Sequence, residues 1–132
     1  MVTEDKIEIL YNNNYGGWGI SKKAFELYQL RSNSEFEKDF HCRNDPILIQ
    51  IYKELGDDFD SKFSRSRIKK IPKKYENYYY IDEYDGKECV KIDYKDYKLD
   101  NIYTKIKEIL QSNNDNNAKI NEIEQFIIGF EM

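Results

Sequence analysis

Apolar and polar residues alternate near the start of the chain. Ile7, Ile9 and Tyr11 fall on one side of residues 6–11, and Leu10 falls on the other. A period of two is typical of a β-strand. Asparagines and the glycines of YGGWG follow directly, which predicts that this strand enters a loop.

Apolar residues at helical spacing predict two helices in the first half of the chain. The first covers residues 22–31 and follows Ser21, a residue type that caps helix N-termini. The second covers residues 46–55, begins after Asp45 and stops at Gly56. The pattern at residues 32–42 is ambiguous, and residues 57–67 are predicted to be a loop.

An Asp-Gly pair at residues 85–86 gives the strongest turn signal of the chain. It lies between alternating runs at residues 78–84 and 87–92, which predicts a β-hairpin. A two-residue turn fixes the register of such a hairpin. The register places four residues on the face predicted to join the core, namely Tyr79, Ile81, Val90 and Ile92.

The last third of the chain is predicted to be helical. Asn101 is the expected cap of one helix, whose apolar positions include Ile102 and Ile106. A polar linker at 113–117 and an amphipathic helix at 118–132 follow. A helix this short is marginal by itself, so we expect it to dock on its own chain or on a twin chain as a homodimer.

These elements predict an α+β fold. A small, mostly antiparallel sheet would contain residues 6–11, a short strand at 68–71 and the hairpin at 78–92, with helices packed on one face. Residues 1–112 would form a single domain, followed by the linker and the C-terminal helix.

Composition narrows the class of protein. Charged residues make up 35% of the 132, and the net charge is −4, which disfavours a protein that coats nucleic acid over its whole surface. Neither a secretory signal nor a membrane span is recognisable, so we expect a soluble, intracellular protein whose two cysteines stay reduced. The excess of Lys, Asn and Tyr indicates an AT-rich genome.

A basic segment follows the second predicted helix. Seven cations fall within thirteen residues without an acid: Lys62, Arg65, Arg67, Lys69, Lys70, Lys73 and Lys74. Tyr75 and the tyrosines at 78–80 come next. Cations beside exposed rings bind single-stranded nucleic acid, so this segment is a candidate for nucleic acid or another polyanion. The alternative is a solvated loop and sheet edge.

The glycine loop offers a second candidate anion site. A strand, a glycine loop and a helix N-terminus carrying Lys22 and Lys23 have the layout of a phosphate cradle. The loop lacks both the Walker pattern and the third glycine of a dinucleotide fingerprint. The alternative is a structural turn with Trp18 packed over it.

Glu83 and Glu88 are predicted to lie opposite each other in the hairpin. Like charges repel there unless a cation separates them, so the pair is a candidate metal site or an acid and base. The alternative is a solvated or lysine-bridged pair.

The cysteines give little support for catalysis. His41 and Cys42 are adjacent, and neighbouring side chains rarely reach each other. Cys89 is predicted to pair with Asp82, where His41 is a conceivable third member. Asp58, Asp60 and Lys62 begin like a calcium loop but lack its glycine and closing glutamate, so that interpretation is rejected.

Several motifs occur in a recognisable order over residues 6–92: YGGWGIS, RNDP opening a helix that ends in ELG, then IP, then IDEYDGKECV. This order resembles a family of small proteins without assigned activity from large DNA viruses, phages, microbes and algae. The resemblance implies a giant-virus origin and no site residues. Many members have an aromatic residue at position 89, which disfavours a catalytic cysteine.

These observations favour a non-enzymatic interaction protein of a large DNA virus, located in the host cytoplasm or in the virion. Its partner would be a viral or host protein, and neither a cofactor nor a membrane is expected. The alternatives are a nucleic-acid or polyanion binder and, third, a small hydrolase in which Glu83, Glu88 and His41 converge.

Overall fold

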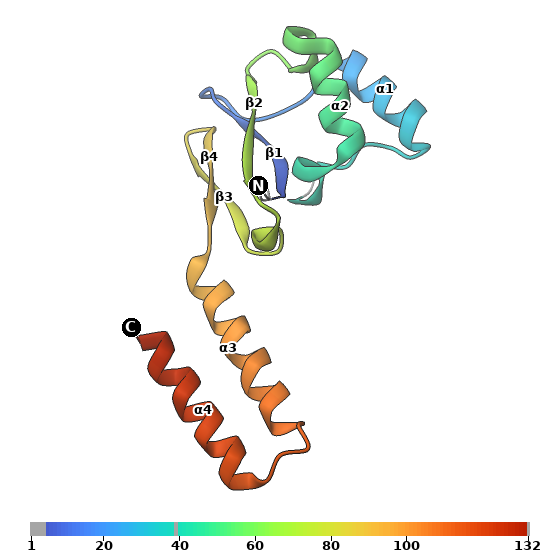
Figure 1. Cartoon of the computed structure of the whole chain (residues 1–132). Coiled ribbons are helices and arrows are strands. Elements are labelled where there is room, and N and C mark those ends of the chain that lie inside the picture. The colour runs from blue at the N-terminus through green and yellow to red at the C-terminus, as the bar shows by residue number, and fades with distance from the viewer. Residues whose placement is uncertain (1–4, 39, 132) are drawn as a thin grey trace. The chain divides into compact units, whose positions relative to one another are not determined.

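The computed structural model describes residues 5–38 and 40–131 and divides the chain into two compact units (Figure 1). Unit 1 extends to Ile92, and unit 2 begins at Asp93. The elements of unit 1 are, in chain order, β1 (Lys6–Asn12), α1 (Lys22–Ser32), α2 (Pro46–Leu55), β2 (Ser66–Pro72), β3 (Tyr79–Tyr84) and β4 (Lys87–Ile92). Short 3-10 turns occur at Phe40–Asn44, Gly56–Phe59 and Lys73–Tyr75.

An antiparallel ribbon of β1 and β2 lies at the centre of unit 1. Its register pairs Leu10 with Ile68 and Ile7 with Ile71. Ile9 and Leu10 are both fully buried although neighbouring side chains of a strand point to opposite faces. The ribbon is therefore covered on both faces.

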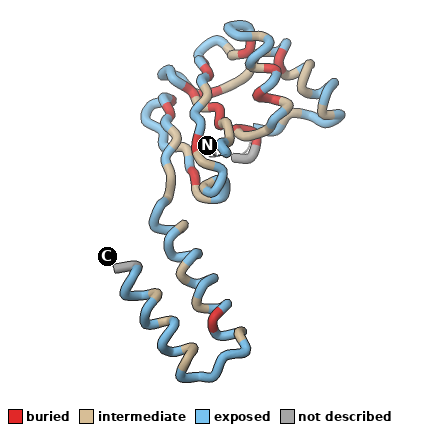
Figure 2. The backbone as a smooth tube through the Cα atoms, in the orientation of Figure 1, coloured by how far each residue is buried: buried red, intermediate tan, exposed pale blue. Residues whose placement is uncertain are grey.

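The helices cover one of these faces. Leu10 packs there with Leu48 and Ile51 of α2, with Ala24 of α1 and with Phe59. Figure 1 shows α1 and α2 side by side on this side of the ribbon, and the buried stretches coloured in Figure 2 include parts of both helices and of β1. This is the larger of the two hydrophobic clusters.

The β3–β4 hairpin covers the other face. Ile9 and Ile71 pack there against Tyr79, with Ile81, Val90 and Ile92 half-buried around them. The pairs Tyr79 with Ile92, Ile81 with Val90 and Glu83 with Glu88 confirm the predicted register. Asp85 and Gly86 have φ values of 52° and 88°, as a tight hairpin turn between twisted strands requires.

The predicted α+β class, with antiparallel strands, a hairpin and helices on one face, is confirmed, and one detail of the sheet differs. The strands form two separate two-stranded sheets rather than one sheet. Helices lie on one face of the β1–β2 ribbon, and the hairpin occupies the other. The physical reason is that β1 carries apolar residues on both faces, and a single sheet covered on one face would leave Ile9 or Leu10 exposed.

Helix starts follow the predicted caps in unit 1. The Ser21 Oγ accepts a hydrogen bond from the Ala24 amide at 3.1 Å, and the Asp45 carboxylate accepts one from Ile47 at 2.9 Å. Both side chains satisfy amides that have no partner within the helix. Gly56 ends α2 with a φ of 57°.

Unit 2 is a pair of antiparallel helices, α3 (Tyr94–Leu110) and α4 (Asn116–Glu131). The predicted cap at Asn101 is wrong, because Asp93 caps α3 by accepting a hydrogen bond from the Asp96 amide at 3.0 Å. The predicted start of the last helix at residue 118 moves to Asn116. Asp115 in the predicted linker accepts a hydrogen bond from the Ala118 amide at 2.7 Å.

The unit boundary falls between Ile92 and Asp93, whereas the sequence placed residues 1–112 in one domain. α3 groups with α4 because the two helices contact each other. Docking of α4 on a twin chain stays a prediction.

Among the described helices, none is both long and apolar enough to cross a membrane.

Candidate functional site

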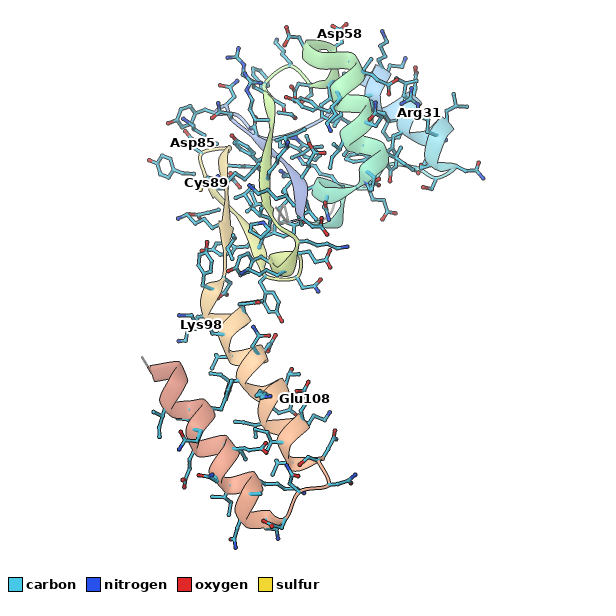
Figure 3. The ribbon with its side chains drawn as sticks, in the orientation of Figure 1. Arg31, Asp58, Asp85, Cys89, Lys98 and Glu108 are labelled. Carbon is cyan, nitrogen blue, oxygen red and sulfur yellow. The ribbon has the colours of Figure 1, made fainter. Side chains whose placement is uncertain are left out.

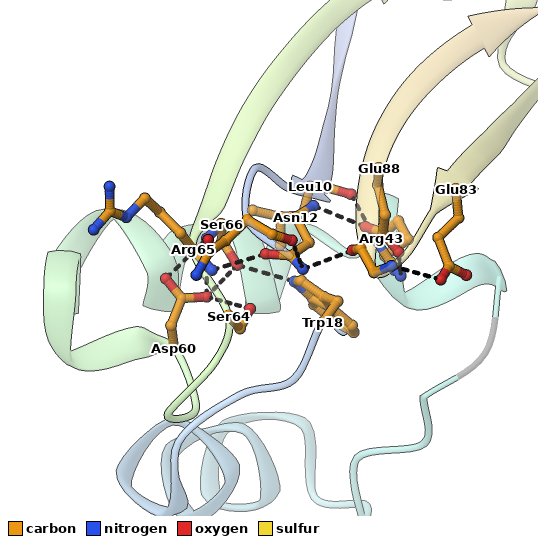
Figure 4. Close-up of polar contacts among 12 residues, drawn as sticks. Leu10, Asn12, Trp18, Arg43, Asp60, Ser64, Arg65, Ser66, Glu83 and Glu88 are labelled. Carbon is orange, nitrogen blue, oxygen red and sulfur yellow. Dashed lines mark hydrogen bonds and ion pairs between the residues drawn. The ribbon is translucent and has the colours of Figure 1, made fainter. Parts of the chain in front are cut away.

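A buried ion pair joins the hairpin to the centre of unit 1. Both terminal nitrogens of Arg43 bind the Glu88 carboxylate, at 2.6 and 2.8 Å, and both side chains are about nine-tenths buried (Figure 4). Glu88 also accepts a hydrogen bond from the Asn12 amide at 2.7 Å, and Arg43 donates to the Leu10 carbonyl at 3.3 Å. The charges are therefore paired and hydrogen-bonded, as burial requires.

Trp18 links this ion pair to the loop before β2. The Arg43 guanidinium lies 4.0 Å from the centre of the Trp18 ring, and the indole Nε1 donates to the Ser66 hydroxyl at 2.9 Å. Ser66 in turn donates to Asp60 through both its hydroxyl and its amide, and Ser64 does so through its hydroxyl. Asp60 thus positions the loop that leads into β2.

The glycine loop lies against the hairpin turn. The Gly16 amide donates to the Asp85 carbonyl at 3.2 Å, and the Asn12 side chain donates to the Gly86 carbonyl at 2.9 Å. A Cβ at Gly86 would lie only 2.2 Å from the Gly17 nitrogen. The YGGWG and EYDG motifs, which are far apart in the sequence, therefore form one contact.

This contact favours the structural interpretation of the glycine loop. Trp18 is 3% exposed and packs under the loop, and the Gly16 amide already has an acceptor. At the start of α1 the Ala24 amide is bound by Ser21, while Lys22 and Lys23 point into solvent. Anion binding by these two lysines stays a prediction.

Glu83 and Glu88 lie opposite each other as predicted, but the expectation that they are solvated or lysine-bridged is wrong for Glu88. Its counterion is Arg43, which lies just beyond the stretch whose pattern was ambiguous. Glu83 accepts a hydrogen bond from the Gly86 amide at 2.9 Å. The described residues contain no group of three metal-ligating side chains. A metal at this pair stays a prediction, and the geometry favours a structural ion pair.

The two cysteines lie in different surroundings. Cys42 is buried, and Cys89 is exposed opposite Asp82. The Asp82 carboxylate binds Lys91 at 2.8 Å, which lowers the pKa of Asp82 and raises that of Lys91. The side chain of His41 lies outside the described residues, so the convergence of His41 with Glu83 and Glu88 is untested.

All seven cations of the basic segment are exposed, whereas Ser64, Ser66 and Ile71 between them are buried. Arg67 and Lys69 of β2 lie on the same face of the ribbon as Ile9. On this face the hairpin strand β4 contacts β1, so these two side chains of β2 stay exposed to solvent. Arg65 precedes them at the same spacing. Lys70 lies on the other face, opposite Glu8. The remaining cations of the segment, Lys62, Lys73 and Lys74, lie in the flanking turns.

The aromatic part of the nucleic-acid hypothesis needs correction. Tyr79 is 6% exposed and belongs to the core, while Tyr75 and Tyr78 are half-buried. Of these tyrosines only Tyr80 is exposed, and it lies on the outer face of the hairpin. Side chains alternate between the two faces of β3, so Tyr79 turns inward while Tyr80 turns outward.

Comparison with models of known protein families, with curated proteins and with solved structures finds no match for this chain.

Proposed function

We propose that this chain is a non-enzymatic interaction protein of a large DNA virus, acting in the host cytoplasm or the virion, and that unit 1 binds a polyanion. The supporting observation is a row of three exposed cations on one face, Arg65, Arg67 and Lys69, which we call the cationic row. The viral assignment is supported by the composition and by the order of motifs over residues 6–92.

None of the three cations of the row forms an ion pair with a described carboxylate, which is also true of Lys70 and Lys87 but not of three other exposed cations of unit 1. Arg31 binds Glu54, Lys53 binds Glu8 at 2.9 Å, and Lys91 binds Asp82. Paired cations contribute little field at a distance. The row keeps its positive charge available for a ligand.

The spacing of the row suits an extended polyanion. Every second residue of a strand lies about 6.6 Å further along its axis, so the three side chains form a regular line of positive charge. Regularly spaced phosphates or sulfates are the ligands for such a line. The acidic net charge of −4 restricts this binding to the local face.

The groups that most resemble catalytic residues serve the fold instead. Of the two carboxylates of the hydrolase alternative, Glu88 is held by Arg43, and Glu83 accepts a hydrogen bond from the Gly86 amide in the hairpin turn. These contacts favour a binding role for unit 1 over the hydrolase alternative.

A salt titration tests this proposal. Binding of a fluorescently labelled single-stranded oligonucleotide would be measured from low to high salt for the wild type and for the triple variant Arg65→Ser, Arg67→Ser and Lys69→Ser. We expect weaker binding and a log–log salt slope smaller by about 2 to 3 counterions, because three phosphate contacts are lost.

A matched control removes three exposed lysines of unit 2, Lys95→Ser, Lys98→Ser and Lys105→Ser, and changes the net charge equally. The control should bind like the wild type. Failure of the wild type to bind at low salt, or equal loss in both variants, would contradict the proposed site.

A further inference from the structure

Three large aromatic side chains are exposed at the hairpin end of unit 1. They are Tyr15, Phe63 and Tyr84, with exposed fractions of 55%, 59% and 79%. They come from the glycine loop, from the loop before β2 and from the end of β3. Asp85, labelled in Figure 3, marks this end at the tip of the hairpin.

Main-chain contacts hold the three segments together. The Gly16 amide donates to the Asp85 carbonyl, the Asn14 side chain donates to the Phe63 carbonyl at 3.2 Å, and the Asn13 amide donates to the Arg65 carbonyl at 2.8 Å. A Cβ at Gly16 would touch the Cβ of Phe63 at 3.0 Å. The rings therefore belong to one surface, although up to 69 positions separate them in the sequence.

Cations accompany two of the rings. The ammonium group of Lys87 lies 5.5 Å from the centre of the Tyr15 ring, and that of Lys62 lies 5.4 Å from the centre of the Phe63 ring. We call these two cations and the three rings the aromatic end. Glu83 and Asp85 are the acidic residues on either side of Tyr84. The cationic row begins here, because Arg65 follows Phe63 by two residues and pairs with Asn13.

We infer that the polyanion bound by unit 1 is single-stranded nucleic acid, whose phosphates follow the cationic row and whose unpaired bases stack on the aromatic end. The inference rests on the proposed function and names its ligand. Exposed rings beside cations are the surface to which unpaired bases bind, since every base has a face that stacks on a ring. A duplex hides those faces, and polyphosphate has none.

The shape of the aromatic end favours nucleic acid over an acidic peptide. The rings project from turns and loops, whereas peptides dock as helices in grooves, as strands on sheet edges or along aromatic-lined channels. Hollows lined by described residues occur between β1 and α2, at Ile7, Pro46 and Ile49, and along α1, at Glu26 and Leu30. None of these residues belongs to the aromatic end.

The test compares three probes on full-length protein: a single-stranded oligonucleotide, its abasic counterpart with the same number of phosphates, and polyglutamate. We expect the wild type to prefer the oligonucleotide over the abasic strand. The variant Tyr84→Ala should lose about 5-fold to 100-fold in affinity for the oligonucleotide, because one base loses its ring. It should bind the abasic strand unchanged.

Two further variants separate stacking from folding. Tyr84→Phe keeps the ring and should restore binding. Tyr103→Ala removes an equally exposed tyrosine from α3, 68% exposed, and should bind like the wild type. Equal binding of oligonucleotide and abasic strand that still depends on the cationic row would overturn the inference and leave the proposed function intact. Loss of dependence on the row would overturn both, and preference for polyglutamate would overturn the inference.

Discussion

Units 1 and 2 are held together in different ways. Unit 1 buries apolar residues on both faces of β1. It also buries the ion pair of Arg43 with Glu88 of the hairpin, which contacts Trp18 and Asn12. Among the described residues of unit 2, Ile109 is the only buried hydrophobic residue. Its helices begin at local caps, Asp93 and Asp115.

The difference shows which substitutions each unit tolerates. In unit 1 the buried polar residues Asn12, Arg43 and Glu88 have partners from distant segments, so the loss of one leaves others unpaired in a low-dielectric interior. In unit 2 most side chains are exposed, and each cap contacts only its own first helical turn, so a substitution at one position should affect few others. Substitutions in unit 1 should therefore have larger effects than matched substitutions in unit 2.

The largest effect is expected from Arg43→Met. It leaves the Glu88 carboxylate buried without its cation and should lower the free energy of unfolding of unit 1 by about 3 to 5 kcal/mol. Urea unfolding followed by the fluorescence of the single tryptophan measures this. Lys91→Ser breaks an exposed ion pair instead and should have little effect. A urea unfolding curve for Arg43→Met that matches that of the wild type would show that the ion pair does not stabilise unit 1.

Gly86→Ala should come second. The new Cβ would fall 2.2 Å from the Gly17 nitrogen at a φ of 88°, so strain and overpacking should cost about 2 to 5 kcal/mol in urea unfolding. Gly129→Ala in α4 is the matched control in unit 2, with nothing within 4 Å of its Cβ. It should raise helix stability by about 0.5 to 1 kcal/mol. Effects of equal sign would contradict the comparison.

Within unit 2, Ile109→Ala tests whether α3 and α4 pack as described. Ile109 is 4% exposed, and removing its side chain should destabilise the helix pair by about 2 kcal/mol, seen as helical circular dichroism lost at lower denaturant. Its neighbour Leu110 is 57% exposed, so Leu110→Ala is the control and should change little. Similar losses from both substitutions would mean that Leu110 is also covered in solution.

The smallest effect concerns pH in unit 1. The Tyr28 hydroxyl donates to Asp45 at 2.5 Å, and this bond raises the pKa of Tyr28 to about 12. The native pKa exceeds the ordinary value of 10.0, so the stabilisation is complete below pH 10 and is lost as pH rises toward 12. Tyr28→Phe should flatten the stability profile in that range, whereas Tyr103→Phe should leave it as in the wild type. An unchanged profile for Tyr28→Phe would contradict the bond.

Turn and cap residues predicted helix starts and the hairpin correctly where these residues lie next to the element. Asp85-Gly86 fixed the hairpin register, and Ser21 and Asp45 marked two helix starts, because a turn or a cap involves residues one to three positions apart. The prediction at Asn101 failed because Asp93 offers an earlier cap directly after β4.

The candidate site was predictable only in part. The run of cations and their exposure could be predicted from the sequence. The burial of the neighbouring tyrosines could not, because Tyr79 points into the core from β3 and Tyr75 packs partly against the same cluster. The exposed rings at Tyr15, Phe63 and Tyr84 had no common sequence signal, since they come from three separate segments.

Patterns of residues close along the chain were sufficient to predict helices α1 and α2, the strands, the hairpin register and the run of cations. No local pattern predicts that Arg43 pairs with Glu88, 45 positions away, or that the Asn12 amide also binds that carboxylate, 76 positions away, because the packing of distant segments brings these groups together. Such partners depend on which faces of β1 the helices and the hairpin cover. Burial then requires that each polar group in the interior find the nearest available partner, whatever its distance along the chain.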